Sequence, residues 1–323
     1  WIVWWALLMG VLLPLGGRLW CLICPVPAPG EWLQRGALVD PPAARRRDGT
    51  ANGGGPARRR WPRALGGIWL QNAAFLGVAL FSALIFTRPR LSAGVLLAFL
   101  VAGFGLALVF DRRSFCRHVC PLGGFIGVYA LAAPLALRVR DADVCAAHRV
   151  KECYLGSSAG YGCPWLERPW QMRRNAYCGL CGECLRTCSR DNVELLLRVP
   201  GADLLSARHW RLDEAYKAFI LLACAAIYPV VFLGPWGRVK AWANLESLGG
   251  FGLYAAGFLA LCLAVVPGLH LGLAVLLRRA AGFQGVATRR LFTALAYPLV
   301  PLGLAAWIAF TLAFVSANLT YAL

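Results

Sequence analysis

Long apolar runs alternate with short polar connections along most of this chain. The runs are rich in Leu, Ala, Val and Phe, and most are long enough to cross about 30 Å of hydrocarbon as a helix. We predict about six membrane-spanning helices, at residues 1–17, 66–87, 92–110, 214–235, 250–276 and 292–318. The pattern therefore indicates an α-helical, multi-pass integral membrane protein.

Residues 121–137 are also apolar, but they favour a different structure. The segment is short, begins with Pro121, contains Pro134 and holds three glycines. Proline and glycine both destabilise a helix interior. We expect an interfacial or re-entrant segment here, with a seventh span as the alternative. A seventh span would place the arginines of residues 278–290 outside the cytoplasm.

Arginines are divided unevenly among the connections. The loop 31–65 holds eight and residues 278–290 hold four, whereas each connection on the other side holds two basic residues. Because short cytoplasmic loops carry an excess of Lys and Arg, we predict that both rich loops and the polar segment 138–213 are cytoplasmic. Residues 40–65, rich in Pro, Gly and Arg, predict a flexible loop that contacts anionic lipid headgroups.

The net charge of +18 does not indicate a nucleic-acid partner. The arginines lie beside apolar spans and form no basic face with interleaved aromatic residues. The 13 cysteines are more informative. All but Cys224 and Cys262, which we expect to be packing residues inside spans, lie outside the apolar runs, mostly in close-spaced groups. Disulfides belong to oxidising compartments, so this grouping favours metal ligation by reduced thiolates.

One cysteine run has the spacing of a bacterial ferredoxin. Cys178, Cys181, Cys184 and Cys188 form C-x2-C-x2-C-x3-C, whose fourth cysteine binds the other cluster in two-cluster ferredoxins. Cys163, followed by proline, completes the first cluster with Cys178, Cys181 and Cys184. Cys188 then joins Cys145 and Cys153 on the second. We predict a two-cluster ferredoxin-like domain at 138–213, whose metal centres substitute for a large apolar core.

The second cluster has three thiolates and needs a fourth ligand. His148 stands three residues after Cys145, where another cysteine is expected. Imidazole replaces thiolate in Rieske centres and raises their potential. We therefore predict that His148 is the fourth ligand. The alternative is a surface histidine beside an open or three-iron cluster.

A further group of four cysteines adjoins the apolar spans. Cys21 and Cys24 end the first span, and Cys116 and Cys120 follow the third; Cys24 and Cys120 each precede a proline. Four thiolates from two loops can enclose an iron–sulfur cluster or a structural zinc ion, and we place the cluster first. The alternative is two unrelated turns with free thiols, in which each proline ends a helix.

At these residues the chain resembles the NapH- and NosR-like membrane-bound polyferredoxins. Paired Cys-Pro motifs beside membrane helices precede a polyferredoxin insert, and the phrases Gly17-Arg18-Leu19-Trp20-Cys21, Cys120-Pro121-Leu122-Gly123 and Gly160-Tyr161-Gly162-Cys163-Pro164-Trp165 add to the match. The resemblance covers roughly residues 15–200 and is loose over the last three spans. The family's cluster sets usually contain eight cysteines, and His148 departs from that pattern.

The resemblance implies electron transfer in a bacterial inner membrane, between a cytoplasmic or quinone donor and a respiratory redox enzyme. It also allows a second hypothesis, a maturation factor that reduces or handles a metal ion for another enzyme. No P-loop or dinucleotide fingerprint is present in the sequence, which favours an electron-transfer subunit over a stand-alone enzyme. The expected cofactors are two [4Fe–4S] clusters, with a third cluster or metal ion at Cys21, Cys24, Cys116 and Cys120.

Three regions follow from these predictions. Residues 1–137 form an N-terminal membrane region with the paired motifs, residues 138–213 form the ferredoxin-like domain, and residues 214–323 form a C-terminal membrane region of three helices. The expected partners are membrane lipid, other redox subunits and a quinone. A quinone or another subunit is needed because the far face of the membrane is about 30 Å from cytoplasmic clusters.

Overall fold

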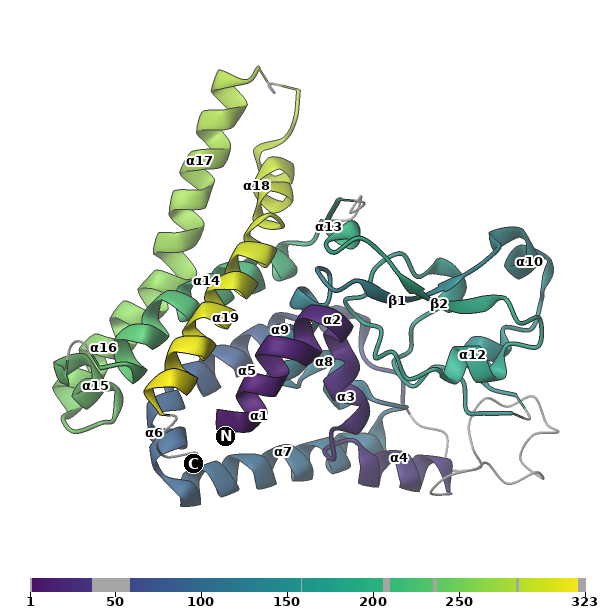
Figure 1. Ribbon diagram of the computed structural model, residues 1–323, viewed down its shortest axis with the longest axis horizontal. Helices are drawn as coiled ribbons and strands as arrows, with labels where there is room; N and C mark the ends of the chain where they lie inside the picture. Colours follow the sequence, from purple (N-terminus) through teal and green to yellow (C-terminus); the bar gives the residue numbers. More distant parts are fainter. Residues whose placement is uncertain are drawn as a thin grey trace. The chain divides into compact units, whose positions relative to one another are not determined.

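The structure, a computed structural model, describes residues 2–36, 59–157, 159–205, 210–234, 237–282 and 285–318 (Figure 1). Most of these residues are helical. Five helices are long and apolar enough to cross a membrane: Ile2–Ile23, Pro89–Val109, Leu212–Phe232, Leu248–Ala280 and Thr288–Ala317. The prediction of a helical protein with several membrane-spanning helices is confirmed, and most of the predicted loop 40–65 lies outside the described residues.

The predicted span at 66–87 is wrong as a continuous helix. It consists of α5 (Trp69–Leu80) and α6 (Ser82–Thr87), which are separated at Phe81. Gly77 and Ser82 flank the break, and helices bend at such residues. Neither piece has the roughly 20 residues that a span requires. The described part of the chain therefore has five long apolar helices where the sequence predicts six.

Residues 121–137 do not form a seventh span. Only α9 (Pro121–Tyr129) is helical there, and a turn then leads into the strand β1 (Leu135–Val139). Nine residues of α-helix rise only about 14 Å, too little to cross a bilayer. The alternative of a seventh span is wrong. Nearly every residue of α9 is buried by other parts of the protein.

The chain forms two compact units. Unit 1 comprises Trp1–Val11, Ile68–Val95 and Leu204–Leu323, and unit 2 comprises Leu12–Gly67 and Leu96–Asp203. The helix α7 (Pro89–Val109) contributes residues to both units. The domain boundaries predicted at residues 137 and 213 stay predictions.

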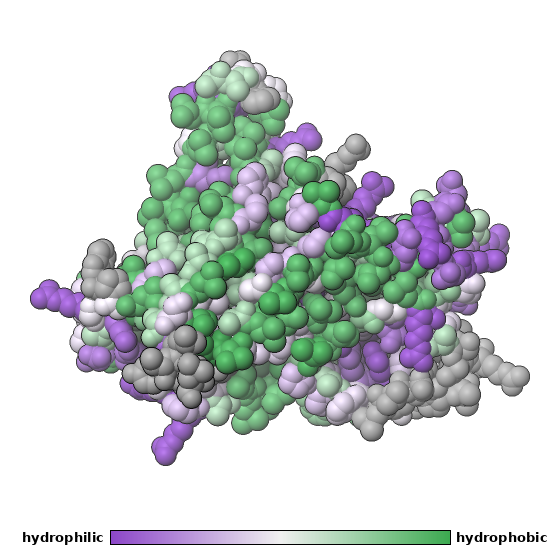
Figure 2. All heavy atoms as spheres, in the orientation of Figure 1, coloured by the Kyte–Doolittle hydropathy of each residue, from purple (hydrophilic) through white to green (hydrophobic). Residues whose placement is uncertain are grey.

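Unit 1 is built around α14 (Leu212–Phe232), which packs against α5, α18 (Thr288–Ala296), α17 (Val266–Ala280) and α19 (Leu299–Ala317). Its remaining elements are α1 (Ile2–Leu7), α6, α15 (Gly237–Ala243), α16 (Leu248–Ala260) and the π-helical turn η6 (Leu261–Val265), with η1 (Leu8–Leu12) at its boundary. Figure 2 shows hydrophobic side chains over α16 and α17 on the face in view. This surface fits a lipid environment.

Unit 2 consists of short helices, loops and one two-stranded sheet. Its elements are α2 (Leu13–Gly16), η2 (Gly17–Leu19), α3 (Trp20–Ile23), α4 (Ala28–Arg35), η4 (Arg63–Leu65), α8 (Ser114–His118), α9, β1, α10 (Ala142–Ala147), α11 (Glu152–Leu155), η5 (Pro169–Gln171), α12 (Glu183–Thr187) and β2 (Val193–Leu197), with α13 (Ala202–Leu205) at its boundary. Hydrophilic side chains gather over α10 and α12 in Figure 2.

The sheet fixes the segment that precedes the ferredoxin-type run. β1 and β2 are antiparallel, with Leu135 opposite Leu197. The carboxylate of Asp203 is fully buried; it pairs with Arg138 of β1 at 3.1 Å and accepts from the backbone N–H of Asn175 at 2.7 Å. A buried carboxylate is stable only when it is paired and hydrogen-bonded, so these contacts hold residue 175 against the sheet.

Candidate iron–sulfur sites

Two motifs that lie far apart in the sequence meet in unit 2. We call Cys21, Cys24, Cys116 and Cys120 the Cys21 set. Cys21 lies in α3, Cys24 directly follows it, Cys116 lies in α8 and Cys120 directly precedes α9. Charge on each of the other three thiols acts on the thiol of Cys116, so the four lie in one neighbourhood. The structure thus brings together the residues that the sequence predicts to share a site.

Burial controls the protonation of these thiols. It raises the pKa of Cys120 to about 12, and with the neighbouring thiols it raises the pKa of Cys116 well above its usual range. Burial also raises the pKa of Cys24. The thiols are therefore neutral at physiological pH in the absence of metal. Metal ligation requires thiolates, so binding releases protons.

Backbone N–H groups surround the sulfur atoms. The thiol of Cys120 accepts hydrogen bonds from the backbone of Gly123 and Leu122, and that of Cys24 accepts one from Val26. The same pattern holds in the ferredoxin-type loops, where Trp165 and Glu167 donate to Cys163, Leu180 donates to Cys178 and Glu183 donates to Cys181. Donors of this kind stabilise negative charge on sulfur and raise the potential of a bound cluster.

Two of these loops contain left-handed backbone that is not glycine. Leu166 has φ 57° and Leu180 has φ 52°. A residue with a side chain is strained in this region, by about 1–2 kcal/mol. Each lies within three residues of a predicted ligand, Cys163 or Cys178. Such strain gathers at ligand-binding sites, because it aims backbone groups that relaxed backbone would not aim.

Two buried guanidinium groups lie beside the Cys21 set. Arg18 is 1% exposed and donates to the carbonyl of Gly123 at 2.6 Å, yet its Nε and Nη1 have no hydrogen-bond partner among the described residues. Arg113 donates to the carbonyl of Cys21 at 2.7 Å and pairs with Glu31. Burial lowers the pKa of Arg113, but the carboxylate of Glu31 and charge on the nearby thiols raise that pKa by more. A cluster with four thiolate ligands is anionic, so it fits the charge that Arg18 leaves unmatched.

We call Cys163, Cys178, Cys181 and Cys184 the Cys178 set. Burial raises the pKa of Cys178 to about 11 and that of Cys181 to about 12, and charge on Cys163 acts on both thiols. Charge on all three acts on Cys184 as well. These are the four ligands that the crossed ferredoxin pattern predicts for one cluster, and the structure places them together.

We call Cys145, Cys153 and Cys188 the Cys145 set. Burial is the main reason that the pKa of Cys153 is raised to about 12, and charge on Cys188 and Cys145 raises it further. The three cysteines line a small hollow that is open to solvent, and His148 lines it too. The structure thus places His148 with the three thiols of the predicted second site. Ligation by His148 stays a prediction.

Asn192 is hydrogen-bonded to two thiols of the Cys145 set. Its Nδ2 donates to Cys145 at 3.2 Å and its backbone N–H donates to Cys188 at 3.4 Å. The amide orientation is determined, because Oδ1 accepts from the backbone N–H of Asp141 and Nδ2 also donates to the carbonyl of Asp141. The sequence gives no signal for this role, since Asn192 acquires it only by packing against α10.

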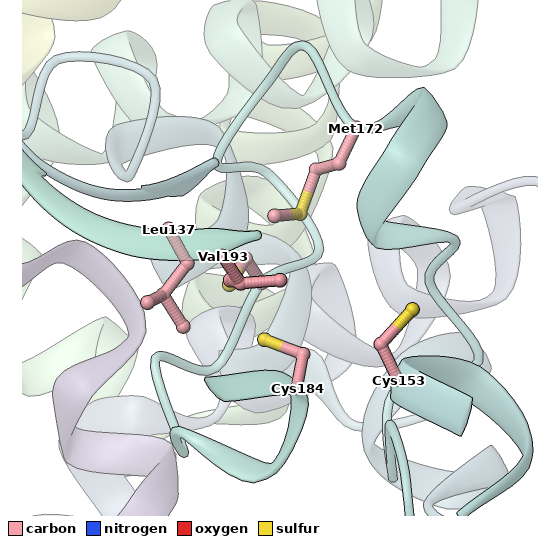
Figure 3. Close-up of a cluster of buried hydrophobic side chains, with 6 residues drawn as sticks. Leu137, Cys153, Met172, Cys184 and Val193 are labelled. Atoms are coloured by element: carbon pink, nitrogen blue, oxygen red, sulfur yellow. The ribbon is translucent and has the colours of Figure 1, made fainter. Parts of the chain in front are cut away.

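The three sets form a continuous series within unit 2. Cys153, Cys178 and Cys184 share one buried apolar cluster, with Cys188 packed against it, and Figure 3 shows Cys153 and Cys184 side by side below Met172. A second apolar cluster contains Cys116, Cys163 and Trp165, with Cys21, Cys120 and Cys181 packed against it. The Cys178 set therefore contacts both of the others.

No single-ion site is found in the described ranges, where no three Cys, His, Asp or Glu side chains approach closely enough to hold one metal ion.

Cys224 and Cys262 form a separate contact in unit 1. Both are fully buried, and their thiols are hydrogen-bonded to each other. The sequence places each of them singly in its own span. Their meeting depends on the packing of α14 against η6, which the sequence pattern does not reveal.

The two segments that contain the paired Cys-Pro motifs match a known protein-family model. Residues 1–47 and 92–138 match the model of a 4Fe–4S binding domain. One segment contains Cys21 and Cys24, and the other contains Cys116 and Cys120. The two copies support iron–sulfur clusters in a polyferredoxin-type membrane protein. Searches of the curated proteins and of the solved structures gave no significant match.

Proposed function

We propose that this protein is a membrane-bound iron–sulfur protein that relays single electrons between a cytoplasmic or quinone donor and a partner respiratory redox enzyme. The observation that supports the proposal best is the series of three cysteine sets in unit 2, in which the Cys178 set contacts both others. A series of adjacent one-electron sites suits a relay better than it suits a single catalytic centre.

The chain would hold three groups through eleven cysteines and one histidine. The Cys178 set and the Cys145 set with His148 would each hold one [4Fe–4S] cluster, and the Cys21 set would hold a third. When bound, such clusters supply reversible one-electron transfer. The protein's own part is to bury the sulfur atoms, to donate backbone N–H groups to them and to place Arg18 and Arg113 beside the Cys21 set.

His148 completes the ligand set at the open hollow in this proposal. The hollow admits solvent, and a neutral imidazole there would lower the negative charge of the site relative to a fourth thiolate. Replacing His148 with cysteine is then expected to lower the midpoint potential of one cluster and leave the others unchanged. An unchanged redox titration would show that His148 is a surface residue.

The setting of the relay is part of the same proposal. We infer a NapH- or NosR-like protein of the bacterial inner membrane, with the cysteine sets and a ferredoxin-like segment at 138–213 on the cytoplasmic side. With six crossings the arginine distribution predicts this orientation, and α5 and α6 would then cross the membrane together as one broken span. Redox subunits, membrane lipid and a quinone are the proposed partners.

A maturation factor that handles a metal ion is less well supported. That function needs an accessible thiol pair, and Cys21 and Cys24 are its candidates. Both are only partly exposed, and both act electrostatically on the buried thiol of Cys116. Four thiols grouped in this way favour a resident cluster over a transfer site.

Counting iron and acid-labile sulfide in the purified full chain tests the proposal. We expect about twelve iron atoms per chain and three redox-active clusters. About eight would leave the Cys21 set without a cluster and favour the maturation factor. A chain that holds no iron, or whose clusters cannot be reduced under physiological conditions, would refute the relay.

A further inference from the structure

Trp165 occupies the boundary between the Cys21 set and the Cys178 set. It directly follows the Cys163-Pro164 pair and is 1% exposed. Its side chain belongs to the same buried apolar cluster as Cys116 and Cys163, against which Cys21 and Cys181 also pack. A single side chain therefore contacts the surroundings of both sets.

The indole lies directly against the Cys178–Cys181 loop. A Cβ atom at Gly179 would come within 2.0 Å of the Nε1 atom of Trp165, so only glycine permits this approach. Nε1 itself has no hydrogen-bond partner among the described residues. A buried indole N–H usually finds a partner, and here it lies beside the loop that would surround a cluster sulfur.

Two cations flank the same ring. The guanidinium carbon of Arg18 lies 5.0 Å from the centre of the Trp165 ring, and that of Arg113 lies 5.3 Å from it. Cation–π contacts between desolvated groups are stronger than those at an exposed surface, so they hold the indole in one orientation. Arg113 also acts electrostatically on both sets, through Cys116 and Cys181.

The backbone around Trp165 is held as firmly as its side chain. Arg117 donates to the carbonyl of Trp165, Arg112 donates to the carbonyl of Cys163 at 2.5 Å, and the backbone N–H of Arg113 donates to the carbonyl of Pro164 at 3.2 Å. Three arginines within residues 112–117 thus donate to carbonyl groups of residues 163–165. The spacing between the two sets depends on this junction.

We propose that Trp165 is the positioning residue that couples the Cys21 and Cys178 sites for electron exchange. It excludes water from the junction, fixes the separation of the two sites and offers its N–H to the sulfur of the Cys178 site. One electron leaves one site and enters the other, while Trp165 keeps its own electrons and no bond forms or breaks. The inference rests on the proposed function, since it requires clusters at both sites.

The test compares Trp165→Phe and Trp165→Ala with the wild-type full chain in lipid nanodiscs. After pulsed photoreduction, freeze-quench EPR measures how fast electrons redistribute between clusters, and EPR of the fully reduced protein measures their magnetic coupling. Because reaction between held partners depends steeply on geometry, Trp165→Ala is expected to slow redistribution about tenfold or more. Trp165→Phe is expected to have a smaller effect.

Trp170→Phe is the matched control. Trp170 packs at the other apolar cluster, with Lys151 at 5.6 Å from its ring, and it is expected to leave this redistribution unchanged. Unchanged redistribution and coupling in Trp165→Ala with full iron content would overturn the inference. Loss of iron from Trp165→Phe would overturn it too, since Trp165 would then hold a cluster. Fewer than two clusters in the wild type would refute the proposed function itself.

Discussion

Cysteines are buried in both compact units, but their surroundings differ. In unit 1, Cys224 and Cys262 lie inside helical turns, where backbone N–H groups are already used by the helix, and their thiols lie against each other beside the buried Lys217. In unit 2, Cys24 and Cys120 lie at helix ends, where backbone N–H groups remain available for sulfur. Burial alone therefore does not mark a ligand. The predicted ligands differ from the packing cysteines in having backbone N–H groups that donate to their sulfur atoms.

Removing one thiol from each unit is expected to give the largest difference between the two units. Cys120→Ala is expected to remove about four iron atoms per chain, because a cubane site needs its fourth protein ligand. Cys262→Ala is expected to remove none. Iron and sulfide analysis of both full-length variants checks this. Equal iron loss from the two variants would mean that the distinction between the units is wrong.

Removing a buried cation should have the next largest effect. Arg113→Met removes the closer partner of the Glu31 carboxylate and leaves it only Arg35 at 3.8 Å, so it is expected to cost about 2 kcal/mol of folding free energy. It also removes positive charge beside two sets, so the midpoint potentials of two clusters should fall.

Arg140→Met is the control for Arg113→Met. The side chain of Arg140 is 52% exposed in its pair with Glu194, and exposed ion pairs contribute about 1 kcal/mol or less. Thermal unfolding and redox titration of both variants measure the difference. Similar losses in the two variants would contradict a special role for the buried cation.

Changing a single N–H donor to sulfur is expected to have a smaller effect, limited to one cluster. Asn192→Asp replaces the Nδ2 donor to Cys145 with an acceptor and adds negative charge, so the potential of one cluster should fall. Asn244→Asp, the same change in unit 1, should alter no potential. Redox titration followed by EPR distinguishes the clusters. A shift shared equally by all clusters would exclude the local effect.

The pH dependence of the iron-free protein should show the smallest difference. Cys120 and Cys181 have pKa values near 12 when folded, against 9.0 for an ordinary thiol. Their raised pKa stabilises the fold below pH 9, and this contribution is lost as the pH rises from 9 towards 12. The iron-loaded protein should lack this loss, because its ligands are already deprotonated. Thermal unfolding of both forms across this range measures the effect.

Most of the membrane helices could be predicted from the sequence, because a span requires only an apolar run of sufficient length. The prediction was wrong at 66–87, where composition is apolar throughout but the chain bends at Phe81 beside the buried Ser82. Hydropathy averages over such a local break. The buried helix α9 shows the opposite case, since its three glycines are hard to place by pattern. The structure explains why one of them is glycine, because a Cβ at Gly127 would lie 2.4 Å from Nη2 of Arg18.

The sequence by itself determined the membrane class and the cysteine groups, because apolar length and close ligand spacing are local properties of a chain. Which groups lie together, and what surrounds them, only the tertiary structure decided. Arg18 contacts Trp165, Arg113 contacts Cys21 and Asn192 contacts Cys145 across long stretches of sequence. No local pattern records such contacts, since they depend on how distant helix ends and loops pack in unit 2.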